Sequence, residues 1–169
     1  MKDLICNQRD IPKEKWRYGL RSSAATGCGW IATYNALQLL GYNTDIGELI
    51  RWYEWQLPLI HGNAGTSFWC PAIRMRSWGF PVETTANPGE FDALVDRSDV
   101  CILFYRWRRG VKLGAHFVAL HKQAGQVIGY NTYRTSTGPD VYGQSLRTFL
   151  KEKHYFGAFL IGIRDKRTP

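Results

Sequence analysis

The chain has 169 residues, 44% of them hydrophobic and 14% aromatic, and this composition is that of one globular domain and not of a disordered chain. Its formal net charge of +8 is compatible with a polyanionic partner, but the charge is scattered along the chain. The densest basic cluster, residues 106–109, is followed by Gly110, which favours a solvated hairpin tip. An acidic or polyanionic partner remains the alternative.

The first eight residues lack the apolar run of a signal peptide, and no stretch approaches the roughly 20 apolar residues of a membrane span. We therefore expect no membrane span and a cytoplasmic location, while secretion of a processed form stays open. The four cysteines, Cys6, Cys28, Cys70 and Cys101, include no Cys-x-x-Cys pair and no metal-ligand spacing. We accordingly expect neither a metal nor a cofactor.

Apolar periodicity predicts helices in the first half of the chain and strands in the second half. Helices are expected at residues 26–40, ended by Gly41, and at 44–56, with shorter ones within 66–78 and 89–97. Strands are expected at 100–107, 115–122, 126–133 and 155–163, with a short helix within 145–153. Helices followed by an antiparallel sheet predict a single α+β domain over residues 1–169.

The sharpest local motif is Thr-Gly-Cys-Gly-Trp at residues 26–30, where the first long helix begins. A cysteine in the first turn of a helix lies at the positive end of the macrodipole and near free N–H groups, and both favour the thiolate. The flanking glycines would let a substrate backbone approach the sulfur of Cys28. A buried thiol in a glycine-rich turn is the other interpretation. Cys101, in an apolar run, is expected in the core, and Cys6 and Cys70 are expected to be structural thiols.

A nucleophilic cysteine needs a base, and the chain has four histidines. His116 lies at the start of a predicted strand, where a side chain can emerge at the end of the sheet. His121 has the opposite parity on the same strand and should face the other side. His61 and His154 are expected to be surface or packing residues.

Asn131, on the next predicted strand, is the candidate for orienting the base. If residues 124–125 form a two-residue hairpin turn, the numbers of paired residues sum to 249. His116 would then face Tyr133, and Asn131 would share the face of His116 as a diagonal neighbour. A register slip of one residue would put Asn131 on the wrong face, and an asparagine without a catalytic role stays open.

The order of these residues along the chain is similar to that in a known enzyme family. Asn-Gln-Arg-Asp at residues 7–10 is followed by Gly-Cys-Gly at 27–29 and by Asn-Ala-Leu at 35–37, within the helix. His116 before an apolar strand and Asn131 on the next strand complete the pattern. The chain resembles the papain-like cysteine peptidases, and within them the bacteriocin-leader (double-glycine) peptidase-like branch.

The resemblance covers residues 7 to about 133 and implies a papain-like fold, in which the cysteine-bearing helix packs on a sheet that carries the histidine and the asparagine. It also implies that Gln8 supplies a side-chain donor to the oxyanion. Many relatives place this glutamine six residues before the cysteine, where this chain has Ser22. Trp30 stands where the branch often has proline, and Asn131 where it often has aspartate. We expect Trp30 to narrow or line the cleft.

The predicted activity is hydrolysis of a peptide or amide bond in a peptide or protein substrate, through a covalent acyl-enzyme. Cys28 would be the nucleophile, His116 the base, Asn131 its orienting group, and Gln8 with the Cys28 N–H the oxyanion donors. Net charge would at most favour acidic peptides through steering.

Three alternatives stay open beside this activity. The first is an amidase, deamidase or acyltransferase on the same scaffold, because specificity lies in the loops of a cleft. The second is a non-catalytic basic module that binds single-stranded nucleic acid through exposed aromatic side chains. The aromatic candidates are Trp52, Trp55, Trp69 and Trp107. Most of them lie on helical or strand stripes typical of a core, so we do not expect nucleic acid as a partner. A degenerate, inactive peptidase fold is a third possibility.

Overall fold

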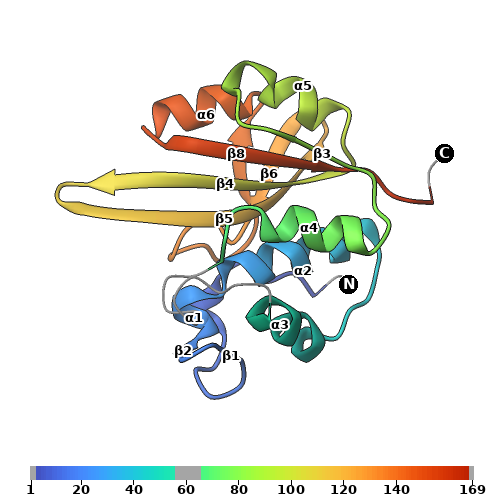
Figure 1. Cartoon of the computed structure of the whole chain (residues 1–169). Coiled ribbons are helices and arrows are strands. Elements are labelled where there is room, and N and C mark those ends of the chain that lie inside the picture. Colours follow the sequence, from blue (N-terminus) through green and yellow to red (C-terminus); the bar gives the residue numbers. More distant parts are fainter. Residues whose placement is uncertain (1–2, 56–65, 168–169) are drawn as a thin grey trace.

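A computed structural model describes residues 3–55 and 66–167, and it shows a mixed helix and sheet architecture (Figure 1). The helices are α1 (Ser23–Thr26), α2 (Cys28–Leu40), α3 (Ile46–Trp55), α4 (Cys70–Ser77), α5 (Phe91–Asp96) and α6 (Leu146–Glu152), with the 3-10 turns η1 (Gln8–Asp10) and η2 (Pro88–Glu90). None of the helices in these two ranges is long and apolar enough to cross a membrane.

The strands form a small hairpin and one six-stranded sheet, in which every neighbouring pair is antiparallel. The hairpin consists of β1 (Arg17–Tyr18) and β2 (Arg21–Ser22). The sheet has the order β3-β8-β4-β5-β6-β7 and comprises β3 (Val82–Thr85), β4 (Val100–Arg109), β5 (Lys112–Gln123), β6 (Gln126–Tyr130), β7 (Asp140–Gly143) and β8 (Phe156–Ile163). The predicted α+β class with an antiparallel sheet is therefore confirmed. The edge strands β3 and β7 have no counterpart in the predicted elements, because each is short and only partly buried.

Helices cover both faces of the sheet (Figure 1). On one face α2 and α4 pack against the sheet through side chains such as Ala36, Leu37, Ile102 and Phe117. On the other face α5 and α6 pack against a second set of side chains. This second set includes Leu94, Leu103, Tyr105, Val118 and Phe149. Burial of apolar surface on both faces accounts for the continuous apolar runs of the central strands.

Helix α2 carries the predicted nucleophile, agrees with the predicted helix in its end and starts two residues later than predicted. It begins at Cys28, while the residues just before it form the separate short helix α1. It ends at Gly41, whose φ of 81° is left-handed and therefore favours glycine. The predicted helix at 44–56 corresponds to α3, which buries Leu49, Ile50 and Tyr53 as its periodicity requires.

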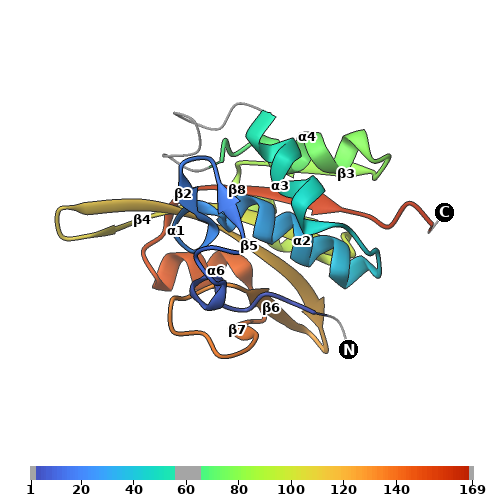
Figure 2. The same ribbon diagram turned by 90° about the horizontal axis from the view of Figure 1, so that it is seen from below.

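The basic cluster lies at a hairpin tip, as predicted. Strands β4 and β5 pair as far as Arg109 and Lys112, and two residues connect them. Pairing of β4 with β8 ends at Arg106 and Phe156, so the hairpin continues beyond that point as a two-stranded ribbon. In both views this ribbon projects past the remaining strands on the side where α1 lies (Figure 1 and Figure 2).

The predicted register of the second hairpin is confirmed where β5 and β6 pair. Gln123 lies opposite Gln126, and every pair back to Ala119 and Tyr130 has residue numbers that sum to 249. The turn places both of its residues at positive φ, 48° at Ala124 and 77° at Gly125. This conformation is that of a type I′ turn, in which alanine is an unfavourable first residue.

Replacing Ala124 by asparagine should stabilise the protein, because asparagine tolerates the left-handed conformation and Asn-Gly is the favoured type I′ pair. We expect Ala124→Asn to raise the free energy of unfolding by about 0.5–1 kcal/mol and the melting temperature by about 2–4 °C. Thermal denaturation measures this effect, with Gln123→Asn, one residue outside the turn, as control. A variant no more stable than the parent would contradict the turn assignment.

Candidate active site

The thiol of Cys28 lies where the start of α2 meets an open edge of the sheet. Strand β6 pairs with β5 only as far as Tyr130, opposite Ala119, so the preceding part of β5 has no β6 neighbour. The backbone N–H of Phe117, on this part of β5, lies near enough to the sulfur to act on the pKa of the thiol. Because a strand N–H points along the plane of the sheet, the sulfur lies at the edge of β5. The Cys28 side chain is half-buried.

Burial dominates the acidity of this thiol. It raises the pKa of Cys28 to about 11, although the backbone N–H groups of Phe117, Cys28 and Gly29 act in the opposite direction. The helix start thus favours the thiolate as expected, but desolvation outweighs it. At neutral pH the thiol is protonated.

The space beside the glycines that flank Cys28 is occupied by other side chains of the protein. A Cβ atom on Gly29 would come within 2.5–2.8 Å of the Thr66 side chain, and one on Gly27 within 2.6 Å of Trp30 Nε1. Packing against Thr66 and Trp30 therefore accounts for glycine at both positions, and approach of a substrate backbone to the sulfur stays a prediction. Trp30 is fully buried and donates a hydrogen bond from Nε1 to Ser23 Oγ at 3.1 Å. It belongs to the core and does not line a cleft.

The imidazole of His116 reaches the same open edge of β5. His116 lies opposite Tyr105 on β4, and the two rings meet edge to face with their centroids 6.0 Å apart. By alternation along the strand, His116 belongs to the face covered by α5 and α6, whereas Phe117 faces α2. The ring reaches the edge, where Nε2 lies 2.6 Å from the backbone carbonyl oxygen of Asn131. Sulfur and imidazole thus approach one edge from opposite faces.

The environment of His116 fixes which ring nitrogen can act as a base. Desolvation, together with the nearby positive charge of Arg134, lowers the pKa of His116, while the carbonyl of Asn131 acts in the opposite direction. The imidazole is therefore neutral at pH 7. Because a carbonyl oxygen can only accept, Nε2 carries the proton that it donates to Asn131, and Nδ1 is left to accept one.

Asn131 differs from its expected position. It follows the last residue of β6 and has a left-handed φ of 66°, so the ladder stops before His116 could pair with Tyr133. The pairing predicted for these two residues is therefore wrong. The carbonyl oxygen of Asn131, and not its side chain, contacts the His116 ring.

The side chain of Asn131 bonds to Gln8 instead. Its Oδ1 accepts from the Gln8 backbone N–H at 2.8 Å, and its Nδ2 donates to Gln8 Oε1 at 3.1 Å. Gln8 in turn donates from Nε2 to the carbonyl oxygen of Ala24 in α1, at 3.0 Å. The turn η1 is therefore tied both to the end of β6 and to the helix that precedes Cys28. Ser22, at the cap of α1, makes no side-chain capping bond.

The four predicted site residues consequently lie in one cluster. Cys28 meets the residue after His116, His116 bonds to Asn131, and Asn131 bonds to Gln8. The residue pattern left one supporting contact unrecognised. Asn35, in the middle of α2, accepts from the Ile5 N–H at 2.9 Å and donates to the Ile5 carbonyl at 2.8 Å. This buried asparagine anchors the N-terminal segment beside the cluster, and its position among apolar helix residues is the signal that could have revealed it.

The remaining histidines do not join the cluster. His121 stacks on Tyr130 at 5.7 Å, and by its parity it lies on the sheet face opposite to His116, as predicted. His154 is exposed, as expected for a surface residue. The expectation for His61 falls on residues 56–65, outside the described residues. The other cysteines also agree with their predicted packing, since Cys70 and Cys101 are buried and Cys6 is half-buried.

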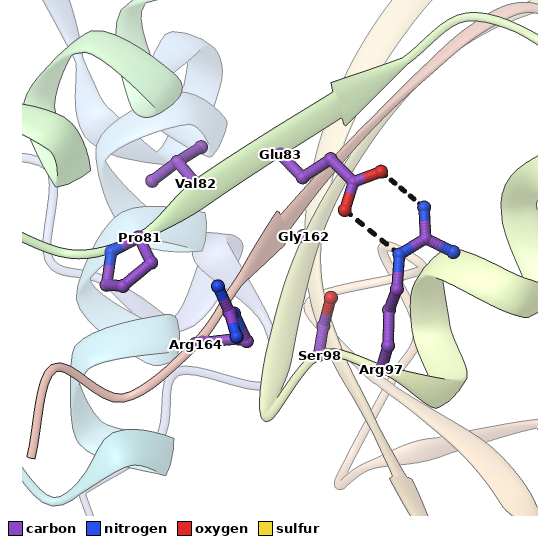
Figure 3. A pocket seen from close by; sticks show the side chains of 7 residues that line it. All are labelled: Pro81, Val82, Glu83, Arg97, Ser98, Gly162 and Arg164. Atoms are coloured by element: carbon purple, nitrogen blue, oxygen red, sulfur yellow. Dashed lines mark hydrogen bonds and ion pairs between the residues drawn. The ribbon is translucent and has the colours of Figure 1, made fainter. Parts of the chain in front are cut away.

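A cavity of about 400 Å³ lies at another place on the sheet, between β3, β8 and the end of α5 (Figure 3). Glu83 and Arg97 form a two-point ion pair there, and Arg164 completes the charged lining. Neither cysteine nor histidine lines this cavity, so it offers no thiol chemistry. The nucleophile candidate therefore lies outside it.

Searches of known proteins add no assignment: no family model matches the chain, and no curated protein sequence matches it. A function is therefore inferred from the cluster alone. Its elements are a desolvated thiol at a helix start, a neutral imidazole held through Nε2, and the Gln8–Asn131 bonds that hold the surrounding segments.

The raised pKa of Cys28 predicts a distinctive pH dependence for its alkylation. Iodoacetamide reacts with the thiolate, so the rate should rise about tenfold per pH unit and show no plateau below about pH 10. Mass spectrometry of the Cys28 peptide measures the rate separately from that of Cys6. In denaturant the alkylation rate at Cys28 should level off above the ordinary cysteine pKa of about 8.5. An alkylation rate that levels off near neutral pH in the folded protein would contradict a neutral thiol at Cys28 beside a neutral imidazole at His116.

The bonds between Gln8 and Asn131 should be measurable as an energetic coupling. Asn131→Gly keeps the left-handed backbone and the carbonyl that holds His116, and it removes only the side chain. We expect Gln8→Ala and Asn131→Gly each to lower the free energy of unfolding by about 1–3 kcal/mol. The double variant should lose about 1 kcal/mol less than the sum of the two. Denaturant unfolding measures the cycle, with Gln144→Ala on the exposed surface as control. Strict additivity would show that the contact carries no energy.

Proposed function

We propose that the chain is a papain-like thiol hydrolase that cleaves a peptide or amide bond through a covalent acyl-enzyme. The observation that carries the proposal is the meeting of the Cys28 sulfur with the edge of β5, one residue from a neutral, oriented His116. A helix that begins at its cysteine and packs on an antiparallel sheet carrying the histidine supports the papain-like fold.

In the proposed reaction, His116 acts through Nδ1, the nitrogen that the carbonyl of Asn131 leaves available. Because thiol and imidazole are both neutral at rest, the proton moves from sulfur to Nδ1 as the sulfur attacks the carbonyl carbon. The bond between sulfur and carbon forms, and the carbonyl π electrons move to oxygen. The electrons on oxygen then re-form the carbonyl, the bond between carbon and nitrogen breaks, and His116 gives its proton to the leaving amine. Water, deprotonated by the same nitrogen, hydrolyses the acyl-enzyme and restores the thiol.

Backbone and side-chain N–H groups would stabilise the negative oxygen of the intermediate. The Cys28 N–H, at the start of α2, is one donor of the proposed pair. Gln8 is the other, since its amide nitrogen carries two hydrogens and uses one of them on the Ala24 carbonyl. Its Oε1 is held by Asn131, which limits rotation of the amide group. Asn131 would thus position both the base, through its carbonyl, and the oxyanion donor, through its side chain.

The proposal predicts covalent labelling of Cys28 by a peptide-like electrophile such as a peptidyl vinyl sulfone or acyloxymethyl ketone. Labelling should require His116, because attack at neutral pH needs a base for a thiol whose pKa is about 11. We expect His116→Ala to slow labelling by about 10²–10⁴-fold and Cys28→Ala to abolish it at this position. Intact-mass measurement followed by peptide mapping detects the adduct.

Two controls make this labelling test decisive. His121→Ala changes a histidine of the same strand that lies outside the cluster, and it should leave the rate unchanged. Iodoacetamide on the unfolded protein should label all four cysteines and so verify that each can be detected. Modification of Cys6 or Cys70 with Cys28 untouched would sink the assignment of the nucleophile.

A further inference from the structure

A groove of about 340 Å³ lies on the projecting ribbon, on the strand β5 that also carries His116 and Phe117. It is lined by Arg106 of β4, Phe156 of β8 and three residues of β5, which are Leu113, Gly114 and Ala115. Leu113 and Phe156 are 69% and 44% exposed, so apolar surface lies open to solvent here. Within the described residues, no helix covers this part of the sheet, because the ribbon extends past α2 (Figure 2).

The groove lies two strand positions along β5 from Phe117, the residue whose backbone N–H acts on the Cys28 thiol. Arg106 and Ala115 are cross-strand partners and share the sheet face of Phe104 and Phe117, the face on which α2 packs. Ala115 precedes Phe117 by two residues, a separation of about 7 Å along a strand. The Phe117 N–H lies near enough to the sulfur to act on the pKa of the Cys28 thiol. A chain with its scissile carbonyl at Cys28 would therefore reach the groove within about two residues.

The electrostatics of the groove favour a negative side chain. The forty positions from Val100 to Pro139 contain six Lys and Arg residues and no Asp or Glu. Within the ranges 3–55 and 66–167, no acidic side chain forms an ion pair with Arg106. The stem of Arg106 lies across Gly157, where a Cβ would come 3.3 Å from Arg106 Cδ, so the guanidinium is supported at the groove. An exposed Arg whose stem packs beside Gly157 and which has no acidic partner within these ranges is well suited to bind a carboxylate.

The edge of β5 favours an extended occupant. Residues 112–118 of β5 continue beyond the last residue that pairs with β6. A peptide that adds to such an edge gains main-chain hydrogen bonds, and its alternate side chains point to one face of the sheet. Side chains on the face of Ala115 would meet apolar surface at Leu113 and Phe156 and the positive charge of Arg106.

We propose that this groove is the substrate subsite and that it takes an extended peptide segment in which an acidic residue is flanked by apolar ones. The inference rests on the proposed function, since it names the substrate class of that site. The carboxylate would bind Arg106, and the apolar neighbours would pack on Leu113 and Phe156. The groove would then select peptides, and the cluster at Cys28 would supply the chemistry.

Binding to the full-length Cys28→Ala protein tests the subsite apart from the chemistry. The probes are three fluorescein-labelled Gly/Ser peptides of about twelve residues with Leu-Glu-Leu, Leu-Lys-Leu or Ser-Glu-Ser at the centre. Fluorescence anisotropy should show tightest binding of the Leu-Glu-Leu peptide. We expect Arg106→Gln to weaken that binding by about tenfold, as loss of a charge-assisted hydrogen bond does. Arg147→Gln, on the exposed side of α6, is the matched control and should have no effect.

Each outcome decides for or against the subsite. Equal binding of the Leu-Lys-Leu and Leu-Glu-Leu peptides, or no effect of Arg106→Gln, would overturn it even if the electrophile labels Cys28. Binding that depends on Arg106, with Cys28 unlabelled, would leave the groove standing and remove the proposed hydrolase. Displacement of the peptide by an oligo-uridine that binds more tightly, with a steep salt dependence, would assign the groove to single-stranded nucleic acid and refute the peptide.

Discussion

The end of strand β6 at Tyr130 is the constraint on which the rest of the site depends. Asn131 takes a left-handed backbone conformation there, and the ladder with β5 stops. This single change leaves the β5 edge open to the Cys28 sulfur. It also turns the Asn131 carbonyl toward His116 and the Asn131 side chain toward Gln8. Had β6 continued in register, its backbone would have occupied the place where sulfur and imidazole now meet the edge of β5.

The balance of two electrostatic effects decides the resting state of the proposed nucleophile. A helix start stabilises a negative charge by about 0.3–1 kcal/mol at exposed sites. Burial, in contrast, raises the pKa of the Cys28 thiol to about 11, and a pKa change of one corresponds to about 1.4 kcal/mol. Desolvation therefore wins at Cys28, and it lowers the pKa of His116 as well. A neutral pair in this partly buried cluster avoids the cost of desolvating two charges in the free protein. The imidazolium and the negative charge then form only in the step in which the sulfur attacks and the substrate carbonyl oxygen accepts the electrons.

The parts of the site that depend on local sequence could be predicted, and the parts that depend on distant contacts could not. The register from Gln123 to Tyr130 follows from a turn of fixed length, so arithmetic gave it correctly. The same arithmetic failed one residue later, because the bonds of Asn131 go to Gln8, 123 positions away. The reason for glycine at position 29 could not be predicted either, since only the fold brings the Thr66 side chain against it. The α+β class was accessible because it depends on the order of the elements.

The spatial arrangement of the basic residues was likewise not predictable from their positions in the sequence. Along the chain the basic residues look scattered, and the cluster at 106–109 looks like a solvated turn. In the fold, pairing of β4 with β5 places Arg106 opposite Ala115, on the same face as exposed apolar surface. An isolated surface arginine gains little from a carboxylate in water. Beside apolar walls, with its stem held over Gly157, it loses less entropy on binding and meets a less hydrated partner. The ribbon thus combines charge and apolar surface at the one edge of the sheet where the thiol also lies.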